Sequence, residues 1–207
     1  MTADVTVRPM VPEEQREVIA MAARAFWPDP LFGVFARDPL HEYRALPAVF
    51  SEILTDLEPG SSEVWIGEHD GRPRGVAAWA APGAYPRSPR QEAARAIRSL
   101  RVMVSLTNRV MAARLLREVE RRHLHEPHWY LALLATDPTV QGRGVGTALL
   151  APVLERCDEQ GIPAYLETQK RTNLSWYARS GFEVVEEVRI GDSPPVWCLR
   201  REPRPIG

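Results

Sequence analysis

The feature that most constrains this chain is a glycine-rich loop between a buried strand and a helix. Residues 129–135 are almost continuously apolar, which predicts a strand covered on both faces, and residues 144–160 repeat apolar side chains at helical spacing. Between them, Gly142, Gly144 and Gly146 stand at alternate positions. Such glycines let the backbone turn several N–H groups toward one point, where the following helix adds its free amides and the positive end of its dipole. The pattern predicts a phosphate-binding loop; the alternative is a tight turn that only packs the helix onto the strand.

The common nucleotide-binding motifs do not fit this loop. No Gly-Lys-Ser/Thr follows the glycines, so the loop is not a Walker motif. The elements downstream do not repeat the strand–helix–strand pattern of a Rossmann half, so GTP and NAD are poor candidates.

The remaining periodicity predicts a single domain of mixed α/β class. A first strand near residues 5–7 precedes a helix over 12–26 and a second over 40–57, and residues 63–69 and 74–81 form a hairpin. One or two helices occupy residues 91–122. After the glycine loop, we expect a strand at 163–168, a short helix at 174–180 and two closing strands at 182–190 and 195–200.

Charge and cysteine content exclude several classes of protein. The 26 basic and 27 acidic residues nearly cancel, which disfavours dedicated nucleic-acid binding. No apolar stretch approaches the ~20 residues that cross a bilayer, and the N-terminus has no signal-peptide layout, so we expect no membrane contact and a cytoplasmic protein. Cys157 and Cys198 are far apart in sequence and are predicted to be buried thiols. Lys170 is the only lysine, and this preference for arginine is typical of a bacterial genome rich in G and C.

Two motifs in the C-terminal half carry a family resemblance. Gln141-Gly142-Arg143-Gly144-Val145-Gly146 fits the Gln/Arg-x-x-Gly-x-Gly/Ala signature of the GNAT superfamily of acetyl coenzyme A-dependent N-acetyltransferases, which the stretch 128–181 resembles. The second hallmark of the superfamily is a helical Asn, an aromatic pair and a Gly-Phe turn. Residues Asn173 through Tyr177, followed by Ser180-Gly181-Phe182, fit it. Residues 127–202, with Tyr165-Leu166-Glu167-Thr168 and Trp197-Cys198, look most like puromycin N-acetyltransferase and its relatives.

The resemblance implies a fold, a division of labour and a co-substrate. The fold is a central mixed, largely antiparallel sheet flanked by helices. Residues 1–127 form the acceptor side, with a helical insertion near 90–122, and residues 128–202 bind acetyl coenzyme A and carry out the reaction. The resemblance lays the pantetheine along the strand end, the pyrophosphate on the loop amides and a further contact on the short helix. These predicted coenzyme-binding residues are Leu134, Ala135, Thr136, Gln141, Gly142, Arg143, Gly144, Val145, Gly146, Thr147 and Asn173.

The resemblance also assigns the proton transfers of a direct acetyl transfer to a primary amine. Glu167 is the predicted base that deprotonates the amine, and Tyr177 is the acid that protonates the leaving thiolate. The alternatives are that Tyr177 only packs its helix onto the sheet and that Glu167 is a solvated or arginine-paired strand-end residue. Asn173 is also expected to cap the helix by accepting a backbone N–H.

The acceptor side is predicted from a cluster of aromatic residues near one acid. Trp27, Asp29, Phe32 and Tyr43, with Phe35, surround the loop between the first two helices, a region that the resemblance implies walls the acceptor pocket. An aromatic pocket with one acid suits a small apolar amine. The alternative is that the aromatics belong to the core. Rival functions are acetylation of a protein N-terminus or lysine, and a module that senses acyl coenzyme A without turnover.

The three histidines at 123, 125 and 128 are not expected to bind metal. No cysteine or carboxylate pair stands at ligand spacing beside them. A solvated, partly capped helix end is the favoured interpretation, and we predict no metal in this protein.

Overall fold

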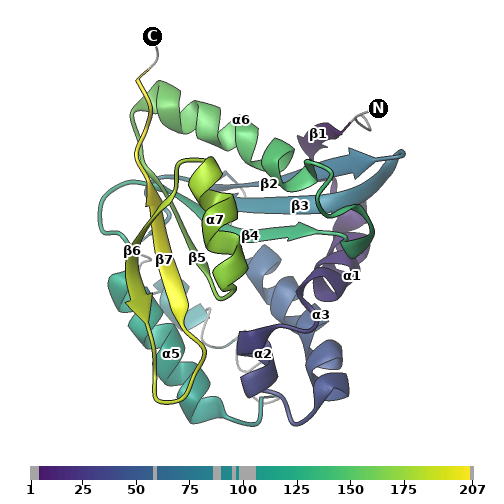
Figure 1. Cartoon of the computed structure of the whole chain (residues 1–207), viewed down its shortest axis with the longest axis vertical. Helices are drawn as coiled ribbons and strands as arrows, with labels where there is room; N and C mark the ends of the chain where they lie inside the picture. Colours follow the sequence, from purple (N-terminus) through teal and green to yellow (C-terminus); the bar gives the residue numbers. More distant parts are fainter. Residues whose placement is uncertain (1–4, 58–59, 86–89, 95–96, 98–105, 206–207) are drawn as a thin grey trace.

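A seven-stranded sheet forms the centre of the computed structural model, which describes residues 5–57, 60–85, 90–94, 97 and 106–205 (Figure 1). The strand order is β1-β2-β3-β4-β5-β7-β6. Only β4 and β5 pair in parallel; the other neighbours are antiparallel. The strands are β1 (Thr6–Pro9), β2 (Ser62–His69), β3 (Arg72–Ala80), β4 (Trp129–Thr136), β5 (Ala164–Thr168), β6 (Glu183–Val188) and β7 (Val196–Arg201). The predicted mixed, largely antiparallel sheet is therefore confirmed.

Helices cover both faces of this sheet. They are η1 (Pro12–Glu14), α1 (Gln15–Phe26), α2 (Pro30–Val34), α3 (Pro39–Asp56), α5 (Arg109–Arg122), η2 (Pro138–Val140), α6 (Val145–Gln160) and α7 (Arg171–Arg179). Helices α6 and α7 bury their apolar side chains against one face, with Trp79, Leu131 and Leu166. Helices α1 and α3 pack on the other face of β2–β4, and α2 and α5 pack on β5 and β7. The sheet thus has two packed faces, as the near-continuous apolar run in β4 predicts.

The pairing of β3 with β4 contains an irregularity that changes which face β4 presents. The register shifts between Ala78 and Trp79, so that Leu133 is opposite Ala78 while Leu131 is opposite Trp79. Leu131 consequently packs with α6, whereas Leu133 packs with α1 and α3 on the opposite face. A β-bulge of this kind redirects side chains and often stands beside a functional site.

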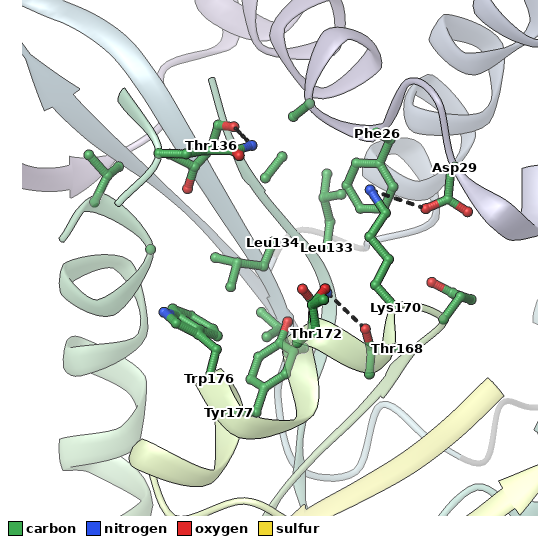
Figure 2. A pocket seen from close by; sticks show the side chains of 18 of the residues that line it. Phe26, Asp29, Leu133, Leu134, Thr136, Thr168, Lys170, Thr172, Trp176 and Tyr177 are labelled. Carbon is green, nitrogen blue, oxygen red and sulfur yellow. Dashed lines mark hydrogen bonds and ion pairs between the residues drawn. The ribbon is translucent and has the colours of Figure 1, made fainter. Parts of the chain in front are cut away.

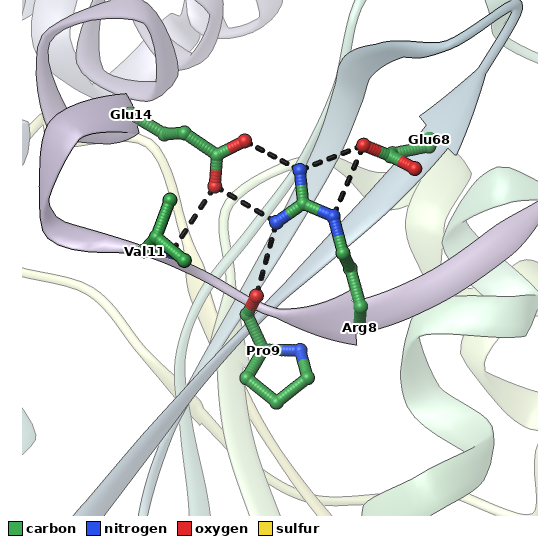
Figure 3. Close-up of polar contacts among 5 residues, drawn as sticks. All are labelled: Arg8, Pro9, Val11, Glu14 and Glu68. Carbon is green, nitrogen blue, oxygen red and sulfur yellow. Dashed lines mark hydrogen bonds and ion pairs between the residues drawn. The ribbon is translucent and has the colours of Figure 1, made fainter.

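Arg8 links β1 to β2 and to η1 through hydrogen bonds (Figure 3). The Arg8 guanidinium donates to Glu68 of β2 at 2.7 and 3.0 Å and to Glu14 of η1 at 2.5 and 2.9 Å. Glu14 also accepts the Val11 N–H at 3.1 Å. Because the hydrogen bond from Arg8 stabilises its charged form, the pKa of the Glu14 carboxyl is lowered. This network ties β1 and the start of α1 to the hairpin.

Most elements lie where the sequence predicts them. The insertion is helical at residues 90–94, 97 and 109–122, residues 106–108 are not helical, and residues 95–96 and 98–105 lie outside the described residues. No helix in the described ranges has the length and apolarity needed to cross a membrane.

Both cysteines are buried and free, which confirms their predicted state. Burial raises the pKa of the Cys157 thiol to about 12 and that of the Cys198 thiol to about 11.

Candidate active site

Strands β4 and β5 diverge, and their divergence opens the sheet. They pair only from Trp129–Leu131 to Ala164–Leu166, after which β4 continues beside β3 and β5 beside β7. The Asp137 N–H bonds to the Arg74 carbonyl at 2.8 Å, and alternation along an antiparallel pair then directs the backbone groups of Leu134 and Thr136 away from β3. Of the predicted pantetheine-binding residues, Leu134 thus places both backbone groups on the open side. Thr136 places its N–H there, since its carbonyl already accepts from Gln141, whereas Ala135 faces β3. An extended molecule can pair with the groups on the open side.

The glycine loop supplies free amides at the mouth of this gap. Gly142 and Gly144 have φ angles of +77° and +86°, a backbone conformation that favours glycine. Gly144 is the N-cap of α6 and no side chain caps the helix, and the first intrahelical bond is donated by Ala148 to the Gly144 carbonyl at 2.9 Å. The N–H groups of Val145, Gly146 and Thr147 therefore have no partner within the helix.

The glycines of the loop have different structural roles. A Cβ added at Gly142 or Gly144 would meet no atom of the described residues within 4 Å, so these two glycines serve the turn of the backbone. A Cβ at Gly146 would lie 3.1 Å from the Trp176 ring, so this glycine lets α6 and α7 approach each other. The packing interpretation considered from the sequence therefore applies to Gly146 alone. The open, uncapped turn fits a diphosphate.

Asp137 anchors the start of the loop. Its carboxylate accepts the Thr139 N–H and hydroxyl at 3.0 and 2.6 Å and the Arg24 guanidinium at 3.0 Å, and Arg74 lies 3.6 Å away. Burial raises the pKa of this carboxyl, but the hydrogen bonds from Thr139 and Arg24 outweigh burial and lower it to about 2. The loop is thus tied to α1 and β3 by a buried negative charge.

A pocket of about 640 Å³ extends from the loop through the gap to the aromatic side chains of α1 and α3 (Figure 2). All the predicted coenzyme-binding residues line it except Arg143, which is exposed on the same loop. Gln141 also donates to the Thr136 carbonyl at 3.2 Å, which holds the loop against the end of β4. The structure therefore brings the loop and the strand end to one cavity.

Tyr177 lies on α7 at the wall of this pocket. Its ring contacts Trp176 and Phe182 with centroid distances of 4.8 and 5.7 Å, and the residue is 7% exposed. Burial raises the pKa of its phenol, so the hydroxyl keeps its proton at neutral pH. Figure 2 shows Tyr177 and Trp176 facing Leu134 across the pocket. The residue both packs α7 onto the sheet and presents a protonated hydroxyl to the gap.

Glu167 lies on β5 at the other wall of the pocket. Its side chain is 8% exposed, and its Oε1 has no hydrogen-bond partner among the described residues. The pKa values of Tyr130 and Tyr165 are raised, first by burial and then by the charge of Glu167, because both phenols lie close to it. The alternative of a solvated or arginine-paired carboxylate does not hold: Glu167 is a buried group facing the cavity.

Asn173 does not cap α7, contrary to the sequence prediction. The helix begins at Arg171, its N-cap is Lys170, and no side chain caps it. Asn173 is inside the first turn and its amide donates to the Thr168 hydroxyl at 3.0 Å. It therefore ties α7 to the end of β5, and it still lines the pocket.

Two of the four predicted acceptor residues reach the pocket. Asp29 and Phe32 line it, whereas Trp27 and Tyr43 do not; both are 43% exposed and contact each other edge to face at 5.8 Å. Their predicted place in the acceptor wall is not supported, because the chain turns them outward beside Pro39, whose carbonyl accepts the Trp27 indole N–H at 3.1 Å. Phe35, also predicted there, is buried against α5, in agreement with the core alternative.

Asp29 is held rigidly at the acceptor end. It is the N-cap of α2 and accepts the N–H groups of Leu31 and Phe32 at 2.9 and 3.4 Å, while its own N–H donates to Glu42 at 2.8 Å. Its second oxygen lies 3.6 Å from the Lys170 ammonium, as Figure 2 shows. A buried carboxylate thus faces the pocket.

Sequence reasoning missed part of this wall. Phe50, Ile53 and Lys170 line the pocket without having been singled out for it. Phe50 and Ile53 follow the helical pattern of α3 like core residues, so periodicity gives no signal for a cavity there. Lys170 is the only lysine in the chain, and that singularity was the one available signal.

The histidine cluster is not the solvated helix end that the sequence favours. His128 is 3% exposed, and the His123 side chain is 11% exposed and lies 3.5 Å from the Glu167 carboxylate; only His125 is exposed. Within the described ranges, no group of three or more His, Cys, Asp or Glu side chains is placed to hold a metal ion.

Comparison with known proteins gives a consistent result. The model of the Acetyltransferase (GNAT) family matches residues 20–182. An uncharacterized N-acetyltransferase of Schizosaccharomyces pombe is 31% identical over 78 residues, 36% of this chain and 32% of that protein. Mycothiol acetyltransferase of Brachybacterium faecium is 44% identical over 55 residues, 25% of this chain and 17% of that protein. The chain therefore matches a third or less of the length of these relatives. A solved structure from Corynebacterium glutamicum, described as histone acetyltransferase HPA2 and related acetyltransferase, is 25% identical, with a TM-score of 0.71 and coverage of 97% of both chains.

Proposed function

This chain belongs to the acetyltransferase (GNAT) family, and on that premise we propose that it transfers an acetyl group from acetyl coenzyme A to a primary amine of a small molecule. The transfer is direct, within a complex of enzyme and both substrates, without a covalent enzyme intermediate. Residues 128–202 would bind acetyl coenzyme A and carry out the reaction, and residues 1–127 would hold the acceptor.

The observation that carries this proposal is one cavity that joins an uncapped helix N-terminus to an opened sheet edge. The free amides of Val145, Gly146 and Thr147 suit a diphosphate. The backbone groups of Leu134 and the N–H of Thr136 suit the amides of a pantetheine. The thioester at the end of such a molecule would lie between the β4 and β5 walls.

The residues on these walls suit the two proton transfers. An alkylamine titrates near ~10.4, so at neutral pH it arrives charged and a base has to remove a proton before it can attack the thioester. Glu167, whose side chain is 8% exposed and lines the pocket, is the proposed base. When the C–S bond breaks, the thiolate takes the proton of Tyr177, which burial keeps protonated.

The acceptor end favours a small amine over a protein chain. Phe26, Phe32 and Phe50 with Ile53 line an apolar wall, and Asp29 is the carboxylate that faces it. This wall suits a compact apolar amine better than a peptide, which an open acidic groove would accept more readily. The likeness of residues 127–202 to relatives of puromycin N-acetyltransferase supports toxic or antibiotic amines as the candidates, in a bacterial cytoplasm.

Thiol release from acetyl coenzyme A across a panel of small primary amines tests the proposal. Turnover with small apolar amines and none with peptide N-termini is the expected result. Micromolar binding of acetyl coenzyme A without turnover on any amine would favour the sensor instead, and absence of binding by calorimetry would exclude both.

The role of Tyr177 is tested by Tyr177→Phe, with Tyr43→Phe as the matched control on the outer surface. Tyr177→Phe should lower kcat by ~10² or more while the dissociation constant of acetyl coenzyme A stays near that of the wild type. An unchanged kcat would remove Tyr177 from the proton transfer and leave it only its packing contacts.

A further inference from the structure

Behind Glu167, two histidines form a hydrogen-bonded pair inside an aromatic cluster. His123 Nε2 lies 2.9 Å from His128 Nε2, and His128 Nδ1 lies 2.7 Å from the Glu126 carbonyl oxygen. On its other side, His123 Nδ1 lies 3.5 Å from Glu167 Oε1. The three side chains thus form a row that starts at the pocket wall and leads away from it.

The hydrogen-bond partners fix where the protons are on this row. A carbonyl oxygen can only accept, so His128 Nδ1 carries the hydrogen. Burial lowers the pKa of His128, so its ring is neutral at pH 7 and its Nε2 is a bare acceptor. His123 Nε2 therefore donates to it, which leaves His123 Nδ1 as the atom that can gain a proton, and this atom faces Glu167.

The surroundings keep the His123 ring in this orientation. Among the described residues, the titratable groups around it are Tyr85, Tyr130 and Tyr165, whose rings have centroids 4.5, 4.6 and 4.9 Å away, with His128 and Glu167. The neighbouring Arg122 is engaged by Glu118 and Glu186. His123 is also the C-cap of α5, so its backbone is fixed at the end of that helix.

The overall reaction produces a proton that has to leave the site. An alkylammonium loses two protons when it becomes an amide, and the departing thiolate takes up one. The other would stay on Glu167, which is buried, and a protonated Glu167 cannot serve as the base in the next cycle.

We propose that His123 is a proton relay that takes this proton from Glu167 at Nδ1 while His128 holds its ring in the required tautomer. This inference rests on the proposed function. In the relay, the Glu167 carboxylate removes one proton from the ammonium, and the amine nitrogen forms its bond to the thioester carbon. As the C–S bond breaks, the thiolate takes the proton of Tyr177, and the second proton of the nitrogen restores Tyr177. The Glu167 O–H bond breaks as the His123 Nδ1–H bond forms, and the imidazolium, on a side chain that is 11% exposed, releases the proton to solvent. His123 touches Glu167 and not the substrate, so it is a positioning residue.

The activity test replaces the ring that carries the proton. His123→Phe keeps the aromatic contacts and His123→Gln keeps a polar group, but neither can carry a proton, and the exposed His125→Gln is the matched control. With an amine that the wild type acetylates, we expect both His123 variants to lose about tenfold or more in kcat at pH 7. The loss should shrink toward pH 9, where more of the amine arrives neutral, with the KM for acetyl coenzyme A unchanged.

A second measurement tests the row without relying on turnover. Ring ¹⁵N NMR of the wild-type protein at pH 8 should show His128 with its hydrogen on Nδ1 and His123 with its hydrogen on Nε2. The opposite tautomer at either ring, or a kcat loss that is the same at every pH in both His123 variants, would overturn the relay. In both cases the wild type would still acetylate amines, whereas failure of the proposed function would appear as a wild type without turnover.

Discussion

The buried charge of Asp137 should contribute measurably to stability, and its contribution should depend on pH. The pKa of this carboxyl falls from an ordinary 3.8 to about 2 in the folded protein. That difference corresponds to about 2 kcal/mol of folding free energy, because each pKa unit is worth about 1.4 kcal/mol. A carboxyl with a lowered pKa stabilises the fold fully above its unfolded pKa and loses that effect as the pH falls from about 4 to about 2.

Asp137→Asn isolates this charge because an amide oxygen can still accept from Thr139. Urea unfolding at pH 7 should show the variant about 2 kcal/mol less stable than the wild type, and the difference should fall to about half of that at pH 3. The control is Asp192→Asn, whose carboxylate is exposed. A difference that stays constant from pH 7 to pH 3, or no difference at pH 7, would refute the assignment of the stabilisation to the carboxylate charge.

Three further predictions follow from the pocket and the core. Gly146→Ala should gain up to about 1 kcal/mol of folding free energy from helix propensity, but its new Cβ, 3.1 Å from the Trp176 ring, should displace that ring. We therefore expect little change in the unfolding free energy and weaker acetyl coenzyme A binding by calorimetry. Unchanged affinity would mean that the ring yields away from the pocket. Glu167→Gln should lower kcat at pH 7, and this loss should shrink as the pH rises and more of the amine is neutral. A loss of kcat that is independent of pH would make Glu167 a binding residue. Cys157 and Cys198, buried thiols with raised pKa values, should react with a thiol reagent only after unfolding, and rapid labelling of the native protein would contradict their burial.

The local sequence pattern was enough to predict the loop and the elements beside it. Glycines at alternate positions before a helical repeat require a backbone with positive φ, and Gly142 and Gly144 have it. The apolar run of β4 and the repeat of α6 are likewise local signals that packing reinforces. The roles of Glu167 and Tyr177 come from the family resemblance, and the structure places both residues at the wall of the same pocket.

The acceptor side could not be predicted in the same way because it depends on contacts between distant segments. Trp27 and Phe32 are five residues apart and both aromatic, yet one is exposed and the other lines the pocket, since the turn of the chain between α1 and α2 decides which way each points. The same holds for His123 and Glu167. They are 44 positions apart in the sequence, and the packing of α5 against β5 and β7 brings their side chains to within 3.5 Å.

The gap itself arises because β4, which pairs with β3 from Tyr130 to Thr136, loses its second neighbour β5 after Leu131. For three residues it pairs with β5 and further on it pairs only with β3, and the bulge opposite Ala78 and Trp79 marks the transition. Before the bulge Leu131 faces α6, and after it Leu133 faces α1 and α3, so both faces stay buried while the edge between them is released. An uninterrupted apolar run is compatible with this shift because every position remains buried on one face or the other. For the same reason, the sequence of β4 predicts a covered strand but conceals the opening on which the proposed coenzyme site depends.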